Sequence, residues 1–256
     1  MRILLTNDDG FEAQGLRVLE EIARTLSNDI WIVAPSTEQS GAGHSLTLNR
    51  PLRIRKHEEQ RYSVDGTPTD SVMMAVARIM KDNPPDLILS GVNRGANLGE
   101  DVTYSGTVSA AMEGALAGVR SIGLSQVYDK GQVNGENLYA VARAWGERVL
   151  KPLVQAKMEP RTLLNVNFPA CEVGSVKGVR VVSQGIRDYG RLQIVTNRDP
   201  RGNEYHWFGL GPMVETPKHS TDLEAVADGY VAITPLHLDL THYDSMDALA
   251  DKFIEL

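Results

Sequence analysis

The sequence of 256 residues has few of the features that stabilise secreted proteins or anchor proteins in membranes. It contains one cysteine, Cys171, so no disulfide can form within the chain. No apolar run approaches the ~18 residues that a membrane-spanning helix needs. The apolar part of the N-terminus, MRILLTNDDG, is too short for the hydrophobic region of a signal peptide. We therefore expect a cytoplasmic protein with no membrane partner.

The charge and composition also limit the partners and the size of the fold. A formal net charge of −7 disfavours broad binding to nucleic-acid polymers or anionic membranes. The chain is 42% apolar and is long enough for one large α/β domain with a full core. We therefore expect a single domain, residues 1–256, that does not bind nucleic-acid polymers.

The first residues of the chain predict a βαβ unit. Residues 2–6 (RILLT) form a short apolar run that is typical of a buried parallel strand. Residues 13–26 repeat apolar side chains at helical spacing, and residues 29–35 form a second continuous apolar run. Such a unit favours a mostly parallel sheet with helices on both faces, which binds ligands at the carboxyl ends of its strands.

The rest of the chain predicts further strands and helices. We expect a hairpin inserted over one end of the sheet (45–66), helices near 69–80, 110–116, 134–152 and 222–228, strands at 86–90, 120–126, 161–169 and 229–236, and a short C-terminal helix. Alternating apolar residues and turn signals in residues 176–215 predict a hairpin-rich extension. We place the core at about residues 1–183 and the C-terminal extension at about 184–256.

Two adjacent acidic residues, Asp8 and Asp9, follow the first predicted strand. Asn7 and Gly10 permit a turn that would bring the two carboxylates together. Because two carboxylates at one strand end repel each other, a cation beside them is the best explanation. Oxygen ligands without thiolates suit Mg²⁺ or Mn²⁺ rather than zinc. On this pattern alone, a helix-capping turn explains the same residues about as well.

A glycine-rich segment, residues 91–107, follows a later predicted strand and leads into a helix. Its candidate functional residues are Asn93, Asn97, Ser105, Gly106 and Thr107. Small and hydroxyl residues at a helix start present N–H groups that can hold a phosphate, although an ordinary N-cap explains the pattern too. No lysine follows the glycine, so this is not a Walker A loop. An acidic pair and an anion cradle at one sheet edge together indicate metal-assisted phosphoryl transfer.

Seven motifs, in this order along the chain, carry a family resemblance: ILLTNDDG, VAPSTEQSGAGHSLTL, VDGTPTDSV, DLILSGVNRGANLGEDVTYSGTVSAAMEG, DPRGNEYHW, STDLEAV and GYVAITPLHLDLT. They resemble the SurE stationary-phase survival proteins, whose members are 5′/3′-nucleotidases. The resemblance covers nearly the whole chain. Departures lie outside the motifs, at Phe11-Glu12 and at residues 128–135, where we expect them to alter substrate access only.

The resemblance implies a set of site residues. One divalent metal ion per subunit, Mg²⁺ or Mn²⁺, would be held by Asp8, Asp9, Ser40 and Asn93. Phosphate contacts would come from Asn97, Ser105, Gly106 and Thr107. Asp8 and Asp9 are the candidate catalytic residues, and the sequence leaves open whether either acts as base or nucleophile.

The resemblance also implies a fold, substrates and an assembly. The fold would be Rossmann-like, with homodimers or homotetramers formed through exchanged C-terminal segments. The substrates would be nucleoside monophosphates, as 5′- and also 3′-esters, together with short polyphosphate. Two other kinds of function remain as alternatives: a non-catalytic nucleotide-binding protein, and a receiver-like signalling protein. A receiver needs a phosphoacceptor aspartate after its third strand, whereas this chain has Gly91-Val92-Asn93 there.

Overall fold

A computed structural model of the chain describes residues 1–128, 138–186, 192–210 and 220–253. The strands are β1 (Arg2–Thr6), β2 (Asp29–Pro35), β3 (Ile54–Glu58), β4 (Arg61–Val64), β5 (Leu87–Arg94), β6 (Arg120–Gln126), β7 (Thr162–Phe168), β8 (Val179–Val181), β9 (Leu192–Arg198), β10 (Glu204–Leu210) and β11 (Val231–His237). The helices are α1 (Gln14–Arg24), α2 (Pro68–Met74), η1 (Ala75–Ile79), η2 (Gly99–Thr103), α3 (Gly106–Leu116), α4 (Ala140–Gln155), η4 (Val173–Ser175), α5 (Asp222–Ala227), α6 (Tyr243–Ala250) and η6 (Asp251–Phe253). None of the described helices is both long and apolar enough to cross a membrane.

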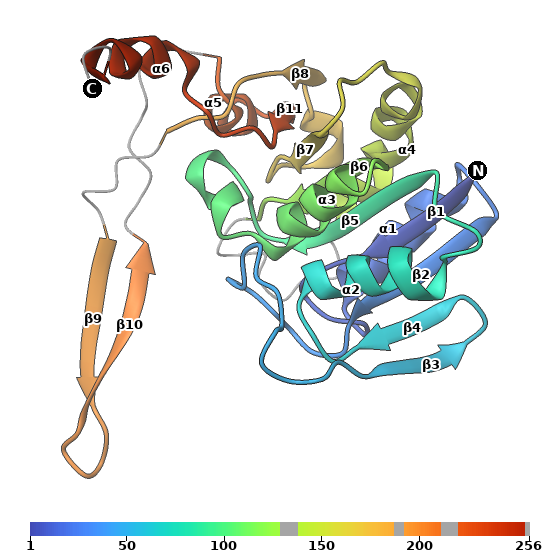
Figure 1. Cartoon of the computed structure of the whole chain (residues 1–256), viewed down its shortest axis with the longest axis horizontal. Coiled ribbons are helices and arrows are strands. Elements are labelled where there is room, and N and C mark those ends of the chain that lie inside the picture. Colours follow the sequence, from blue (N-terminus) through green and yellow to red (C-terminus); the bar gives the residue numbers. More distant parts are fainter. Residues whose placement is uncertain (129–137, 187–191, 211–219, 254–256) are drawn as a thin grey trace.

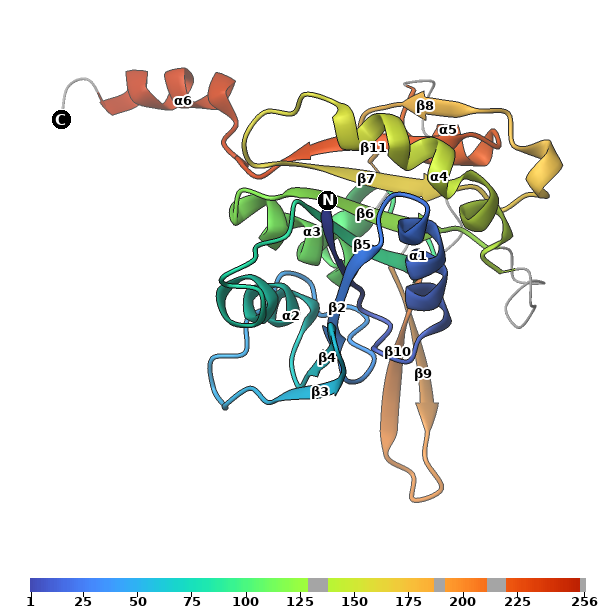
Figure 2. The same cartoon turned by 90° about the vertical axis from the view of Figure 1, so that its right-hand side faces the viewer.

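A nine-stranded sheet in the order β3-β4-β2-β1-β5-β6-β7-β11-β8 forms the centre of the molecule (Figures 1 and 2). Its pairs are parallel except for β3 with β4 and β7 with β11. Helices α1 and α4 pack on one face, while α2 and α3 pack on the other. The prediction of a mostly parallel α/β sheet with helices on both faces is therefore confirmed, and β9 with β10 adds the expected hairpin.

The two faces of the sheet differ in polarity near the carboxyl ends of the strands. On the face covered by α1 and α4, the buried apolar strand residues belong to one core cluster, and Gln126 at the end of β6 is a buried polar residue that accepts from the Ala142 N–H of α4 (3.0 Å). On the other face, Leu4 and Ile88 are apolar, but Thr6, Ser90 and Asn165 closer to the carboxyl ends are polar and fully buried. Near the carboxyl ends of the strands, where the site is expected, the interior is therefore polar on the face covered by α2 and α3.

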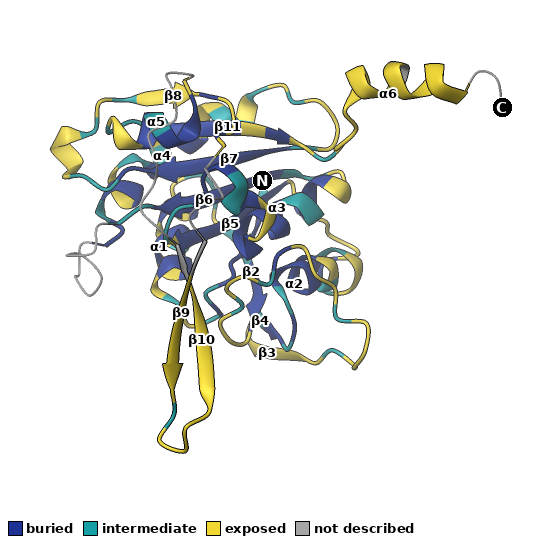
Figure 3. Cartoon of the chain, turned by 90° about the vertical axis from the view of Figure 1, so that its left-hand side faces the viewer, coloured by how far each residue is buried: buried dark blue, intermediate teal, exposed yellow. Residues whose placement is uncertain are grey.

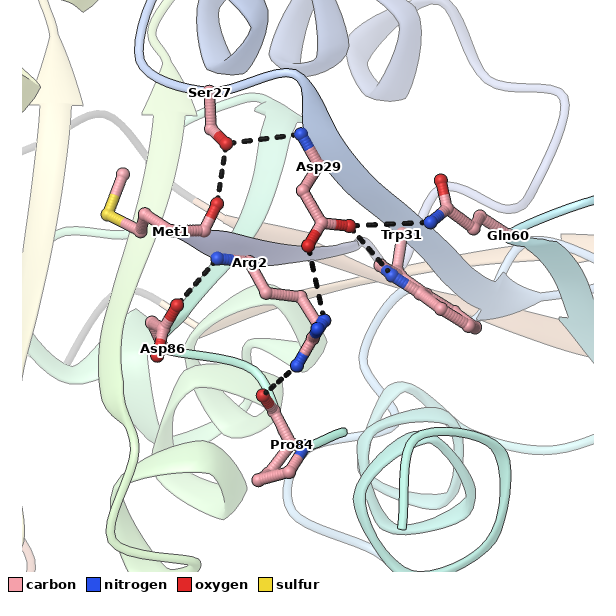
Figure 4. A network of polar contacts seen from close by, with 8 residues as sticks. All are labelled: Met1, Arg2, Ser27, Asp29, Trp31, Gln60, Pro84 and Asp86. Atoms are coloured by element: carbon pink, nitrogen blue, oxygen red, sulfur yellow. Dashed lines mark hydrogen bonds and ion pairs between the residues drawn. The ribbon is translucent and has the colours of Figure 1, made fainter. Parts of the chain in front are cut away.

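The amino ends of β1 and β2 are fixed by polar contacts (Figure 4). The backbone N–H of Arg2 donates to Asp86 Oδ2 (2.6 Å), and its Nη1 donates to the Pro84 carbonyl (3.1 Å). Arg2 also pairs with Asp29 Oδ2 (Nε to Oδ2 3.3 Å), and Trp31 Nε1 donates to Asp29 Oδ1 (3.1 Å). These contacts set the register of β1 at the edge opposite to Asp8 and Asp9.

The structure corrects the expected position of the hairpin in residues 45–66. Strands β3 and β4 do not lie over one end of the sheet but continue it beyond β2. The physical reason is that the backbone of β2 accepts a further parallel partner, with Pro35 opposite Val64. The turn between β3 and β4 places Gln60 at a positive φ of 62°.

Two further predicted elements differ in detail from the structure. The helix expected at 69–80 is α-helical only to Met74, and η1 continues it as a π-helix. The strand expected at 86–90 extends to Arg94, with an irregular register after Ser90 where Gly91 has a φ of 130°. The strand therefore carries Asn93 itself. Residues 129–135 and the first part of the helix expected at 134–152 lie outside the described residues, and α4 covers the rest.

The C-terminal part of the chain contributes both to the sheet and to projections away from it. Strand β11 lies between β7 and β8, so the sheet contains residues on both sides of position 183. The β9–β10 hairpin and α6 extend away from the sheet (Figures 1 and 3). The exposed apolar residues of the hairpin and of residues 240–253 include Ile194, Val195, Tyr205, Trp207, Phe208, Leu240, Tyr243, Met246, Leu249 and Phe253.

Candidate active site

Asp8 and Asp9 lie directly after β1, where three other segments meet them. The Thr107 hydroxyl, from the first turn of α3, donates to Asp8 Oδ1. The Gln39 N–H donates to the Asp8 carbonyl (2.7 Å), and the Arg94 N–H at the end of β5 donates to Asp9 Oδ2 (3.1 Å). The acidic pair therefore joins the carboxyl ends of β1 and β5, the loop after β2 and the start of α3.

The surroundings of both carboxylates disfavour their charged forms. Burial raises the pKa of Asp8 to about 6, and the nearby charge of Asp9 acts in the same direction. Burial also raises the pKa of Asp9, with a further contribution from Glu38. Two like charges at one strand end, with Asp8 buried and Asp9 half-buried, are stabilised by a cation between or beside them. The pair therefore has the electrostatics of a cation site.

The candidate ligands Asn93 and Ser40 would add neutral oxygens to the two carboxylates. Within the described residues, no group of three or more His, Cys, Asp or Glu side chains could hold a metal ion. A metal bound at Asp8 and Asp9 would need neutral ligands as well, and Asn93 is next to the residue that contacts Asp9. Its Nδ2 donates to the Gly95 carbonyl (3.1 Å), so metal binding would use the amide oxygen. Such an all-oxygen set fits Mg²⁺ or Mn²⁺.

Ser40 lies in the loop that borders the acidic pair. The loop is attached to the acidic turn by the Gln39 bond to Asp8, and to η2 by the Gly43 N–H, which donates to the Tyr104 carbonyl (3.1 Å). The Ser40 hydroxyl donates to Glu38 Oε1 (2.9 Å). As a metal ligand, Ser40 would have to exchange this bond for one to the ion.

The first turn of α3 packs directly on Asp8. Ser105 is the N-cap, and its Oγ accepts from the Val108 N–H (3.1 Å). A Cβ on Gly106 would lie 2.7 Å from Asp8 Cβ, so only glycine permits this approach. The Thr107 hydroxyl is engaged with Asp8. An anion here would therefore be held chiefly by backbone N–H groups and the helix dipole.

Asn97 lies in the loop after β5 and is 6% exposed. Its Nδ2 donates to Ser125 Oγ (2.8 Å), which uses one of the two amide hydrogens. The second hydrogen of this amide is the one that could reach a phosphate oxygen. The structure thus brings Asp8, Asp9, Asn93 and the start of α3 together, with Asn97 and Ser40 in the bordering loops.

Sequence reasoning missed three residues beside the acidic pair. Glu38 and the backbone of Arg94 act on Asp9. Tyr139 is 3% exposed, and burial together with the charge of Asp9 raises the pKa of its hydroxyl. Glu38 lies in a motif that the sequence had already marked. No local pattern indicates Tyr139, because it reaches the site only through the fold.

Comparisons with known proteins identify the family of the chain. Residues 3–191 match the model of the family described as survival protein SurE. The 5′-nucleotidase SurE of Rhizorhabdus wittichii is 63% identical over 97% of this chain and 98% of its own length, and that of Erythrobacter litoralis is 56% identical over 99% and 100%. A crystal structure of the SurE protein from Aquifex aeolicus, 38% identical, superposes with a TM-score of 0.84 over 97% of this chain and 98% of its own. The chain therefore belongs to the SurE family.

Proposed function

We propose that this protein is a divalent-metal-dependent phosphatase that hydrolyses nucleoside monophosphates to nucleoside and phosphate. The observation that carries the proposal is the contact between Asp8 and the first turn of α3, because it sets the acidic pair beside the N–H groups at a helix start. It is supported by full-length relatives at 63% and 56% identity that bear the name 5′-nucleotidase. We extend the substrates to 5′-esters, 3′-esters and short polyphosphate.

In this proposal Asp8, Asp9, Ser40 and Asn93 hold one divalent ion per subunit, Mg²⁺ or Mn²⁺. When bound, such an ion supplies charge neutralisation and lowers the pKa of coordinated water. The N–H groups of Gly106 and Thr107 and the hydroxyl of Ser105, with the Asn97 amide, hold the phosphate oxygens, because the Ser105 N–H donates to the Asp101 carbonyl and the Thr107 hydroxyl donates to Asp8. These donors stabilise the charge that shifts onto the oxygens in the transition state.

The proposal is tested by measuring phosphate release from a panel of 5′- and 3′-nucleoside monophosphates and a generic aryl phosphate. We expect EDTA to abolish release and added Mg²⁺ or Mn²⁺ to restore it, because the two carboxylates alone repel a phosphate. Release in EDTA that metal does not increase would contradict the metal site. Nucleotide binding without release under any metal would favour the non-catalytic binding protein instead.

We also propose that the C-terminal extension, residues 184–256, joins subunits into homodimers or homotetramers in the cytoplasm. The hairpin and α6 expose large apolar side chains, including Trp207 at 65% and Phe208 at 82%. Exposed patches of this kind mark association surfaces. The single cysteine fits a reducing compartment.

Replacing Trp207 and Phe208 by serine is therefore expected to reduce the mass of the assembly measured by light scattering after size exclusion. The reason is that large buried aromatic residues supply most of the affinity of such interfaces. Replacing the surface residues Arg53 and Arg55 by serine is the control, and we expect it to keep the wild-type mass. An unchanged mass in the hairpin variant would exclude this hairpin as the joining surface.

A further inference from the structure

The loop of residues 95–99, between β5 and η2, is held by residues from distant parts of the chain. The N–H of Asn97 donates to Asn167 Oδ1 (2.9 Å). Its carbonyl accepts from Asn165 Nδ2 (2.7 Å) and Asn167 Nδ2 (3.1 Å). Both asparagines lie on β7 and are fully buried. The middle of the loop is therefore fixed from below by the sheet.

The end of the same loop is held by the C-terminal part of the chain. Asp222, fully buried at the first residue of α5, accepts from the Gly99 N–H (2.9 Å) and the Gly185 N–H (2.8 Å). Gln184 Nε2 donates to the Gly99 carbonyl (2.9 Å). Leu98 packs in an apolar cluster with residues of α5 and β11. Both polar groups of Gly99 are thus bonded to residues beyond position 183.

Burying the Asp222 carboxylate carries a large desolvation cost, which an apolar side chain filling the same space would not have. Asp222 offsets it with charge-assisted bonds from backbone donors in two directions. Its Oδ2 faces the N–H of Gly99, while its Oδ1 faces those of Gly185 and Leu223, the latter at 2.9 Å. It also lies at the positive end of α5. Among short side chains, a carboxylate is the one whose two acceptor oxygens can serve these three donors.

We propose that Asp222 is a positioning residue for the phosphate-binding edge of the active site. Through Gly99 it fixes the loop that carries Asn97 and leads through η2 to Ser105 and the first turn of α3. The inference rests on the proposed function, which assigns these residues to the phosphate oxygens. Asp8 and Asp9 lie on a separate segment, and Asn93 precedes the loop within β5, where it pairs with Ser125 of β6. A displaced loop therefore alters phosphate binding far more than metal binding.

The substitution Asp222→Asn tests the Gly99 contact selectively. The amide oxygen can keep the two donors on the Oδ1 side, Gly185 and Leu223, which leaves the amide nitrogen facing the Gly99 N–H. Two opposed donors push the loop away. We expect KM for an aryl phosphate and Ki for orthophosphate to rise together by about tenfold, since a displacement of ~1 Å is enough for such losses. The metal concentration that gives half-maximal activity should stay within about twofold, because Asp8, Asp9 and Ser40 lie on other segments and Asn93 is held in β5 by its pairing with Ser125 of β6.

Glu224→Gln is the matched control, because it makes the same change from carboxylate to amide on the same helix. Glu224 Oε2 caps α5 by accepting from the Thr221 N–H (3.1 Å), so this variant weakens the helix end and leaves the Gly99 bond in place. We expect its KM and Ki to equal those of the wild type. Gln184→Ala removes the other bond to Gly99 at an exposed position. It should also raise KM and Ki, and it tests the role of the Gly99 contacts if Asp222→Asn does not fold.

The outcomes separate this inference from the proposed function. A wild-type protein that releases no phosphate with any metal contradicts the proposed function. An active wild type with unchanged KM and Ki in both Asp222→Asn and Gln184→Ala overturns the positioning role. A lower kcat at unchanged KM and Ki overturns it too, because a partly unfolded population loses active sites without altering the affinity of those that remain.

Discussion

Asp8→Asn is expected to lower kcat/KM for nucleoside monophosphates by roughly a thousandfold, the loss typical of removing a group that stabilises charge in a transition state. The substitution removes one of the two charges that would hold the metal ion. It keeps the shape of the side chain, and its amide oxygen can still accept from the Thr107 hydroxyl. The measurement is steady-state phosphate release over a titration of Mg²⁺ or Mn²⁺.

Asp65→Asn is the control for this substitution, because Asp65 pairs with Arg50 at the surface and its side chain is 49% exposed. We expect the control to match the wild type in activity and in metal requirement. Asp8→Asn with undiminished turnover at limiting metal would remove Asp8 from the metal site and would favour a catalytic centre elsewhere.

The same variant should be more stable than the wild type when metal is removed. Burial raises the pKa of Asp8 from 3.8 to about 6, so the folded protein binds this proton more tightly than the unfolded chain. Stability therefore falls as pH rises from about 4 to above 6, by up to about 3 kcal/mol at 1.36 kcal/mol per pKa unit. At pH 8 in EDTA, Asp8→Asn should melt at a higher temperature than the wild type, and the difference should vanish near pH 4. A lower melting temperature at pH 8 would contradict this cost of burial.

Gly106→Ala is expected to lower kcat/KM by roughly a hundredfold, since a displacement of about 1 Å in an active site has this effect. The new Cβ would lie 2.7 Å from Asp8 Cβ and 3.0 Å from Pro68 Cγ, so either α3 or the acidic turn must move. The clash costs about 1–3 kcal/mol, while alanine in a helix gains about 1 kcal/mol. The net loss of stability is therefore between zero and about 2 kcal/mol, so the thermal midpoint should fall by no more than about 8 °C, too little to unfold the protein at assay temperature.

Gly174→Ala is the matched control, because a Cβ at Gly174 meets no atom within 4 Å. We expect it to leave both activity and melting temperature unchanged. If Gly106→Ala kept full activity, the first turn of α3 would tolerate displacement from Asp8, and its part in holding phosphate would be excluded.

Much of the fold follows from local patterns in the chain. The continuous apolar runs of β1 and β2 with the helical spacing of α1 predicted a βαβ unit, and the structure contains it. The sequence patterns did not predict the features that depend on which strands pair with each other. The alternation in residues 45–66 predicted a hairpin, but only the free backbone of β2 determined that β4 would join the sheet. Strand β5 likewise continues through an irregularity in its register to Asn93, beyond the apolar run at residues 86–90 from which the strand was predicted.

The sequence by itself determined the kind of site: two carboxylates at the end of a buried strand, and small residues at the start of a helix. These are chemical properties of short segments, and they require no knowledge of what lies opposite. The tertiary structure alone decided which distant groups complete the site. The bond from Thr107 to Asp8, the buried Tyr139 beside Asp9, and the bond from Asp222 to Gly99 join residues far apart in the chain. Such contacts depend on the order of the strands in the sheet, so a local sequence pattern does not predict them.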